Sequence, residues 1–169
     1  IKKYNKFIII YRNRGINENL NDLIKFRKEC KLKLIDFYVA NDMTLSIALN
    51  SDGIYLSSHN KSLKVLNKKK PNFKIIGSAH NIKEIYCKLK QGCSYILLSK
   101  LFRVDYDLKS PFLGLIKFNN YSKINPNILV PLGGIKIKNL NLLKIVDCMA
   151  FALLSEIKKK PADIINRLF

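Results

Sequence analysis

The chain alternates between short apolar runs and longer stretches in which apolar residues recur at helical spacing. The short runs are rich in β-branched residues and have the length of strands. Because these runs are almost unbroken by polar residues, both faces of the sheet they form are expected to be buried, as in parallel sheets. We expect seven strands, at Phe7–Tyr11, Ile35–Ala40, Gly53–Leu56, Phe73–Ile76, Ser94–Leu98, Ile128–Leu132 and Cys148–Leu154.

Helices are expected between these strands and after the last one. Gly92 is placed to end the second of them, and Pro161 lies near the start of the last. Repeated alternation of strand and helix predicts an α/β fold with a parallel sheet. The helical spacing is carried by Leu20–Phe26, Ile82–Leu89, Leu140–Ile145 and Ala162–Leu168.

Two α/β architectures fit this alternation, a doubly wound open sheet and a (β/α)8 barrel of the TIM type. A barrel collects the carboxyl ends of all its strands in one ring, whereas a doubly wound sheet uses only the loops at its switch point. Polar turns alone would also place polar residues there, but their presence after every strand favours the barrel. They are Arg12, Arg14, Asn41, Asp42, Ser57, Ser58, His59, Asn60, Ser78, His80, Ser99, Lys100, Arg103, Gly133, Gly134, Ser155 and Glu156.

Seven strands do not close an eight-stranded barrel. We therefore expect a first strand–helix unit of roughly 20–25 residues upstream of Ile1. Residues 1–169 are interpreted as a single barrel domain, incomplete at its N-terminal side.

The chain is strongly basic, with a net charge of +19 from 31 basic and 12 acidic residues. Lysine accounts for 26 of the basic residues and arginine for only five. Because arginine is favoured in specific phosphate and base contacts, we interpret the lysines as general surface residues and expect no specific nucleic-acid partner. No stretch approaches the roughly 18 apolar residues of a membrane span, so no membrane partner is expected.

Four cysteines occur without a Cys-x-x-Cys pair, which gives no support for a zinc or redox motif and fits a reducing cytoplasm. They are Cys30, Cys87, Cys93 and Cys148.

Three groups at the strand ends are candidates for chemistry. His80 could act as a general acid or base, or could be a hydrogen-bonded structural residue. Asn41 and Asp42 could hold Mg²⁺ and a substrate oxygen, or could form a turn that caps the following helix. Gly133 and Gly134 would let backbone N–H groups approach an anion, in a loop position where barrels often bind phosphate, although a plain glycine turn has the same sequence.

Four segments make the chain resemble the thiamine phosphate synthase family, which includes the thiazole tautomerase (TenI) branch. They are VANDMTLSIALNSDGIYLSS, IIGSAHNIKEIYCKLKQGCSYILLSKLF, LVPLGGI and FALLSEI, in the family's order. The resemblance implies a (β/α)8 barrel and a transferase of thiamine biosynthesis. Such synthases join a hydroxymethylpyrimidine pyrophosphate to a thiazole phosphate, with Mg²⁺ on the pyrophosphate that leaves.

The resemblance also implies roles for particular residues. Arg12 matches the family's basic segment, Arg14 replaces its lysine, and Ile10 replaces its glutamine. Asn41 would contact the pyrimidine pyrophosphate, and Asp42 would bind Mg²⁺. The remaining matches are Ser78 and His80 for the Ser-Thr-His segment, Gly133, Gly134 and Ile135 for the Gly-Gly-Ile loop, and Ser155 for the late serine of the phosphate site.

Two family features are altered in this chain. The second metal-binding aspartate falls at Asn60, which brings no negative charge to Mg²⁺, and the phosphate-binding Thr-x-Thr-Lys loop is not recognisable within Arg103–Lys109. Lys100, Arg103 and Lys109 could compensate as point charges. Three hypotheses follow: a synthase, a metal-independent thiazole phosphate tautomerase in which His80 moves a proton, and a non-catalytic binder of a phosphorylated ligand. The oligomeric state is not readable from the sequence.

Overall fold

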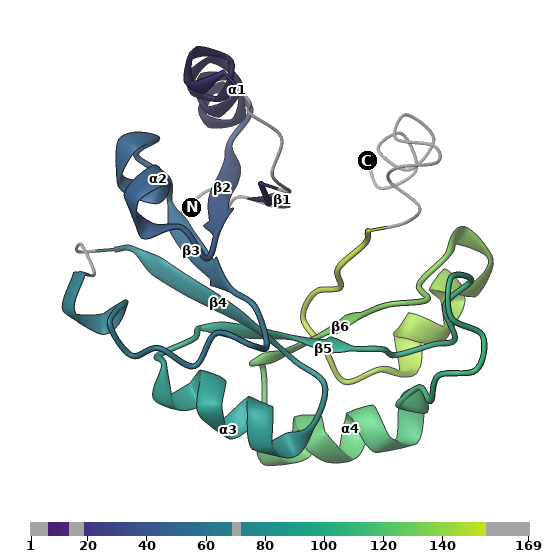
Figure 1. Ribbon diagram of the computed structural model, residues 1–169. Helices are drawn as coiled ribbons and strands as arrows, with labels where there is room; N and C mark the ends of the chain where they lie inside the picture. Colours follow the sequence, from purple (N-terminus) through teal and green to yellow (C-terminus); the bar gives the residue numbers. More distant parts are fainter. Residues whose placement is uncertain (1–6, 14–18, 69–71, 155–169) are drawn as a thin grey trace, which may run out of the picture. The chain divides into compact units, whose positions relative to one another are not determined.

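The structure is a computed structural model that describes residues 7–13, 19–68 and 72–154 (Figure 1). It contains six strands, four α-helices and two 3₁₀ helices in these ranges. The strands are β1 Phe7–Tyr11, β2 Ile35–Ala40, β3 Gly53–Leu56, β4 Lys74–Ala79, β5 Tyr95–Ser99 and β6 Leu129–Leu132. The helices are α1 Leu20–Leu32, α2 Met43–Ala48, α3 Ile82–Lys90 and α4 Gly114–Ile124, with 3₁₀ helices η1 Leu66–Lys68 and η2 Ile137–Ile145.

The strands follow one another in the sheet in chain order, β1-β2-β3-β4-β5-β6. The pairings of β1 with β2, β2 with β3, β3 with β4, and β5 with β6 are all parallel. A doubly wound sheet reverses its strand order at a switch point, and this sheet has no such reversal in the described residues. The strand order is therefore that of a TIM-type barrel, as the sequence predicted.

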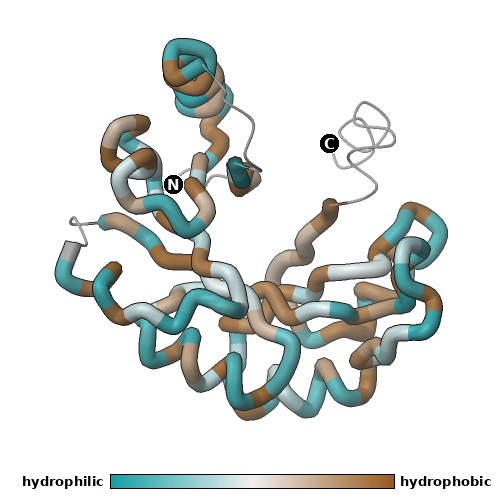
Figure 2. Tube along the Cα trace, viewed as in Figure 1, coloured by the Kyte–Doolittle hydropathy of each residue, from teal (hydrophilic) through white to brown (hydrophobic). Residues whose placement is uncertain are grey.

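The contacts divide the chain into two compact units. The first contains the described residues up to Gly77 together with Cys87–Ser94, and the second contains Ser78–Tyr86 and the described residues from Tyr95 onward. Figure 2 shows hydrophobic and hydrophilic residues alternating along α3, as expected for a helix with one buried face.

The expected strands at Phe7–Tyr11, Ile35–Ala40 and Gly53–Leu56 are confirmed at their expected bounds. The fourth expected strand continues to Ala79, so Ser78 lies inside β4 rather than after it, and it is buried. The segment Leu140–Ile145 is part of the 3₁₀ helix η2 rather than of an α-helix.

The expected seventh strand, Cys148–Leu154, is wrong. Only Ala152 pairs, in an isolated parallel bridge with Leu132, and its N–H donates to the Pro131 carbonyl at 2.9 Å. Backbone groups of Pro131 therefore face this segment, and proline has no N–H to continue the ladder. The helix expected within Ala162–Leu168 lies outside the described residues.

The core of the first unit packs one side of β2 against α1. Phe37 and Val39 of β2 are buried with Leu23 and Cys30 of α1. The Phe37 ring also contacts the Phe26 ring edge-on, with centroids 5.9 Å apart, a favoured arrangement for aromatic pairs. All four cysteines are free thiols, and burial raises the pKa of Cys93 to about 12. No helix in the described ranges is long and apolar enough to cross a membrane.

Asp52, in the loop before β3, connects α1 to β2. Its Oδ1 accepts a hydrogen bond from Arg27 Nη2 at 2.8 Å, and its Oδ2 accepts one from the Phe37 backbone N–H at 2.8 Å. Phe37 has no exposed surface, so its N–H would have no water partner if the carboxylate were removed.

We predict that Asp52→Ala lowers the free energy of unfolding by about 1–3 kcal/mol, because it leaves a buried backbone donor and Arg27 Nη2 without their carboxylate acceptor. Urea unfolding followed by circular dichroism measures this change. Glu29→Ala, at an exposed position of α1, is the matched control and should stay within about 0.5 kcal/mol of wild type. Equal stabilities of the two variants would contradict the prediction.

Candidate functional site

Asn41 and Asn60, both predicted as site residues, lie together in the first unit. Asn41 directly follows β2 and has a left-handed backbone, with φ +58°. Its Oδ1 accepts hydrogen bonds from the Ser57 backbone N–H at 2.9 Å and from Asn60 Nδ2 at 3.3 Å. The amide oxygen of Asn41 is therefore occupied within the protein, and its Nδ2 group remains the donor available to a ligand.

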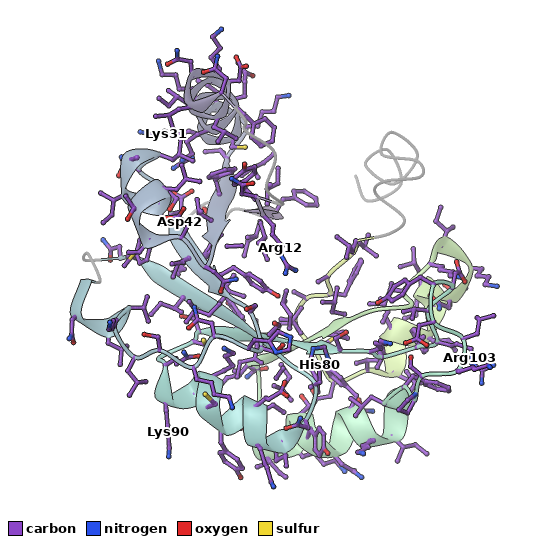
Figure 3. All side chains as sticks on the ribbon, viewed as in Figure 1. Arg12, Lys31, Asp42, His80, Lys90 and Arg103 are labelled. Carbon is purple, nitrogen blue, oxygen red and sulfur yellow. The ribbon has the colours of Figure 1, made fainter. Side chains whose placement is uncertain are left out.

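Asp42 begins helix α2, and its Oδ1 accepts the Leu45 backbone N–H at 2.9 Å. This is the helix-capping role that the sequence left open beside metal binding. Its other carboxylate oxygen, Oδ2, accepts no hydrogen bond from the residues that the structure describes. Asp42 is exposed (Figure 3), so this oxygen can meet a ligand or a cation without a further change in the capping contact.

A cavity of about 240 Å³ lies next to these residues in the first unit. Its apolar lining includes Ile54 and Leu56 of β3. Ile54 pairs with Val39, so both residues lie on the face of the sheet that packs against α1. The cavity thus has both apolar and polar side chains in its lining. It is lined by Asn41, Met43, Ile54, Leu56, Asn60, Ser62, Lys64 and Val65.

Arg12 follows β1 and is exposed, so its guanidinium is available to an anion (Figure 3). Arg14 and Ser155, the other basic and hydroxyl residues predicted for the site, lie outside the described residues. Their predicted roles stay predictions.

His80 lies in the second unit, between β4 and α3 (Figure 3). Its Nδ1 is 3.2 Å from the Ser99 carbonyl oxygen. A carbonyl only accepts, so this contact requires a proton on Nδ1, and in the neutral form of the ring Nε2 is then the acceptor. The His80 backbone N–H donates to Glu84 Oε2 at 2.8 Å. Glu84 in turn exchanges hydrogen bonds with Asn81 at the start of α3, which fixes the backbone beside His80.

Gly133 and Gly134 form a tight turn after β6 in the second unit. Their φ values are +92° and +70°, a conformation that favours glycine at both positions. A Cβ on Gly133 would lie 3.2 Å from Lys100 Cα, and one on Gly134 would lie 2.5 Å from the Phe102 carbonyl oxygen. The glycines are therefore needed for close packing against the segment after β5. Within the described part of the chain, the N–H groups of Gly134 and Ile135 donate to no other residue.

The segment Arg103–Lys109, where the resemblance predicts a phosphate-binding loop, is held by ion pairs to Lys100 and Lys136. Lys100 Nζ donates to Asp107 Oδ2 at 3.0 Å and to Ser110 Oγ at 2.5 Å. Lys136 forms a second ion pair with Asp105. The hydrogen bond from Lys100 and the contact with Ser110 lower the pKa of the Asp107 carboxyl below its ordinary value. Lys100 and Lys136 thus carry acidic partners of their own, which the sequence comparison did not reveal.

A cation site made of protein carboxylates alone is not present in the described ranges, where no three His, Cys, Asp or Glu side chains gather. Mg²⁺ in proteins commonly keeps several waters and binds one or two carboxylates together with substrate phosphates. Asp42, with its open Oδ2, fits that second kind of site. Asn60 already uses Oδ1 to accept the Ser62 N–H at 3.0 Å.

Sequence reasoning missed Lys88 and Gln91, which bind the loop carrying Asn60. Lys88 Nζ donates to the Asn60 carbonyl at 2.7 Å, and Gln91 Nε2 donates to it at 3.0 Å. Both side chains have no exposed surface. The sequence signal that could have revealed the burial of Lys88 is its spacing. Lys88 lies three residues after Ile85 and so on the same, buried face of α3.

We predict that Gly134→Ala is more destabilising than Gly114→Ala by about 1–3 kcal/mol, the usual cost of overpacking. Both glycines have positive φ values, +70° and +74°, so both substitutions carry the same backbone strain. Only at Gly134 would the new Cβ meet backbone carbonyls, since nothing lies within 4 Å at Gly114. Thermal and urea unfolding of the two variants measure the difference; equal losses would contradict the packing assigned to the turn.

We predict that Lys100→Met raises the pKa of the Asp107 carboxyl toward its ordinary value of 3.8. Because the folded-state pKa is lowered, the ion pair is present at neutral pH and is lost as the pH falls through that lowered value. A ¹³C NMR titration of the carboxyl carbon measures the change. Lys109→Met, which removes an exposed neighbouring charge, should leave the titration where it is in wild type, and an unchanged titration in Lys100→Met would contradict the assigned contact.

Comparison with known proteins bears on this arrangement. Residues 4–157 match the family described as thiamine monophosphate synthase. The chain is 31% identical over 144 residues to a thiamine-phosphate synthase of Prochlorococcus marinus strain AS9601, which covers 83% of this chain and 40% of that protein. It is 26% identical over 155 residues to a thiamine-phosphate synthase of Persephonella marina, covering 90% of this chain and 74% of that protein.

A solved structure titled thiamine phosphate pyrophosphorylase, from Pyrococcus furiosus, resembles this structure with a TM-score of 0.69 at 20% sequence identity. The similarity covers 94% of this chain and 81% of that one, and it supports the α/β fold of the TIM-barrel type. The match to the family profile extends over most of the chain and includes β1–β6. The chain belongs to the thiamine monophosphate synthase family.

Proposed function

We propose that the protein is a transferase that couples hydroxymethylpyrimidine pyrophosphate to thiazole phosphate. In this reaction the bond between the pyrimidine methylene carbon and the pyrophosphate oxygen breaks, and pyrophosphate leaves with the electron pair. A bond then forms between that carbon and the thiazole nitrogen, which supplies its lone pair. The proposal rests on the family, and on one observation above the others: Asn41 and Asp42 follow β2 with the Asn41 Nδ2 and the Asp42 Oδ2 open to a ligand.

The first unit is proposed to bind the pyrimidine pyrophosphate. Asn41 Nδ2 would donate to the pyrimidine or to a pyrophosphate oxygen, and the Arg12 guanidinium would offset the charge of the leaving group. Asp42 Oδ2, together with pyrophosphate oxygens, would hold Mg²⁺, which supplies further neutralisation of pyrophosphate when bound. Asn60 is proposed to act on Asn41 rather than on the metal, because its amide already contacts Asn41 Oδ1 and the Ser62 N–H.

The second unit is proposed to bind the thiazole phosphate at the Gly133–Gly134 turn. The backbone N–H groups of Gly134 and Ile135 are suited to donate to phosphate oxygens, since they have no acceptor among the described residues. The charges of two lysines beside the turn are partly offset, because Lys100, which packs against Gly133, is paired with Asp107 and Lys136 with Asp105. Backbone donors are therefore expected to contribute more to phosphate binding here than lysine side chains. Ser78 and Ser155 remain proposed contributors of hydroxyl groups.

A thiazole phosphate tautomerase is the second candidate, and the geometry of His80 favours it. With Nδ1–H directed to the Ser99 carbonyl, the neutral ring would present Nε2 to take a proton from a substrate carbon or nitrogen. This reaction needs no metal, so the replacement of the second family aspartate by Asn60 would not affect it. In that case Asp42 would serve only as the cap of α2.

Isothermal titration separates these candidates. We predict that the protein binds hydroxymethylpyrimidine pyrophosphate in the presence of Mg²⁺, and that Asp42→Asn weakens this binding at least about tenfold, as loss of a metal contact does. Asparagine caps helices as well as aspartate does, so the variant removes the charge and keeps α2. Thiazole phosphate binding should be unchanged in the same variant.

The control is Asp22→Asn, on α1, which is exposed and should bind both ligands like wild type. Binding of the pyrimidine pyrophosphate that is insensitive to chelator and to Asp42→Asn would contradict the synthase assignment. Chelator-insensitive turnover of thiazole phosphate that is lost in His80→Ala would establish the tautomerase. Thiazole phosphate binding with no turnover of either kind would indicate a binding protein.

A further inference from the structure

Lys88 is the one charged side chain in the described residues that has no exposed surface. It lies on α3, and its aliphatic part passes beside Gly77 of β4. A Cβ on Gly77 would lie 2.6 Å from Lys88 Cδ and 2.9 Å from Lys88 Cγ, so only glycine leaves room for the side chain. Burying an ammonium group is costly unless hydrogen bonds compensate it. The ammonium group of Lys88 therefore needs hydrogen-bond acceptors inside the protein.

The Lys88 ammonium donates to three oxygen atoms. These are the Ser57 carbonyl at 2.7 Å, the Asn60 carbonyl at 2.7 Å and Gln91 Oε1 at 2.9 Å. The three acceptors match the three protons of the group. Gln91 adds hydrogen bonds from its Nε2 to the Asn60 carbonyl at 3.0 Å and to the Ser62 carbonyl at 2.8 Å. Together the two side chains fix the backbone of residues 57–62, which we call the 57–62 loop.

The 57–62 loop in turn holds Asn41. The Ser57 N–H and the Asn60 amide both donate to Asn41 Oδ1, at 2.9 and 3.3 Å. An amide whose oxygen is held in this way has one orientation, with Nδ2 directed away from its two donors. The contacts therefore form a continuous series from the Lys88 ammonium, through loop carbonyls and loop donors, to the Asn41 side chain. Every residue of this series lies in the first unit.

We propose that Lys88 is a positioning residue for the pyrimidine pyrophosphate, because it fixes the loop that orients the Asn41 amide. The proposal rests on the proposed function of Asn41 as a ligand contact. A buried ammonium suits this task since its hydrogen bonds to carbonyls are charge-assisted and shorter than those of neutral donors. The nearby charge also bears on Cys93, whose thiol pKa is raised by burial and lowered in smaller part by Lys88.

The test compares the dissociation constants of two ligands in matched variants of the protein. Lys88→Met keeps most of the buried aliphatic chain and removes the three donors. It should weaken binding of hydroxymethylpyrimidine pyrophosphate with Mg²⁺ about tenfold or more, the usual effect of losing an outer-shell partner, and leave thiazole phosphate binding unchanged. Lys90→Met is the control, because Lys90 lies two residues along the chain, is exposed and points into solvent (Figure 3); it should bind both ligands like wild type.

A selective change in one ligand distinguishes positioning from a purely structural role, which would lower the unfolding temperature and affect both ligands alike. If Lys88→Met does not fold, Gln91→Met decides, since it removes two of the loop hydrogen bonds and keeps Lys88. Wild-type affinity for the pyrimidine pyrophosphate in a folded Lys88→Met or Gln91→Met variant overturns this inference and leaves the proposed function standing. A wild-type protein that binds no pyrimidine pyrophosphate overturns both.

Discussion

Parallel pairing of consecutive strands is the constraint on which the rest of the structure depends. Because β1, β2 and β3 run in the same direction, each must end at the same edge of its part of the sheet, and each is followed there by a polar segment. Arg12, Asn41 and the 57–62 loop are the first groups met after these three strands. The chemistry proposed for the first unit is thus a direct result of strand direction, as is usual in barrels of this type.

Backbone groups and loops outside the regular sheet pairing need other hydrogen-bond partners, and this protein supplies charged side chains for them. Asp52 bonds the Phe37 N–H beneath the α1 packing, and Lys88 bonds the carbonyls of the loop after β3. In the second unit Asp107 bonds Lys100 in the loop after β5. These contacts share one feature. A charged side chain forms a hydrogen bond with a backbone N–H, a backbone carbonyl or an oppositely charged side chain, at a place where the sheet supplies no partner.

Much of the fold could be predicted from the sequence because its signals are local. The strand Ile35–Ala40 is rich in β-branched and aromatic residues, and its bounds were predicted without error. Helix α4, Gly114–Ile124, was not predicted, since it contains adjacent asparagines and leaves Ile116 and Ile124 exposed, which obscures its periodicity. The seventh strand is absent because the Pro131 backbone faces the segment Cys148–Leu154. Which way Pro131 faces is set by the register of the sheet, so the sequence of the segment itself does not show it.

The sequence motifs predicted which residues belong to the candidate site, but not the side chains and backbone groups that hold them in place. The placement of Asn41 beside Asn60 and of His80 beside Ser99 agrees with residues selected from the sequence, although the partners that fix them were not foreseen. Lys88 was hidden because a lysine on an amphipathic helix is ordinarily solvated. Its burial depends on Gly77, which belongs to β4 rather than to α3. The two residues become neighbours only in the folded chain, so the pattern of the helix alone does not show the contact.

The central proposal is that the protein transfers the pyrimidine from pyrophosphate to the thiazole nitrogen. The most direct measurement is ³¹P NMR of the protein mixed with hydroxymethylpyrimidine pyrophosphate, thiazole phosphate and Mg²⁺. The account predicts that resonances of free pyrophosphate and thiamine phosphate grow together in equal amounts, and that chelator stops both. Persistence of the two substrate spectra, with protein that is folded and binds both ligands, would contradict it.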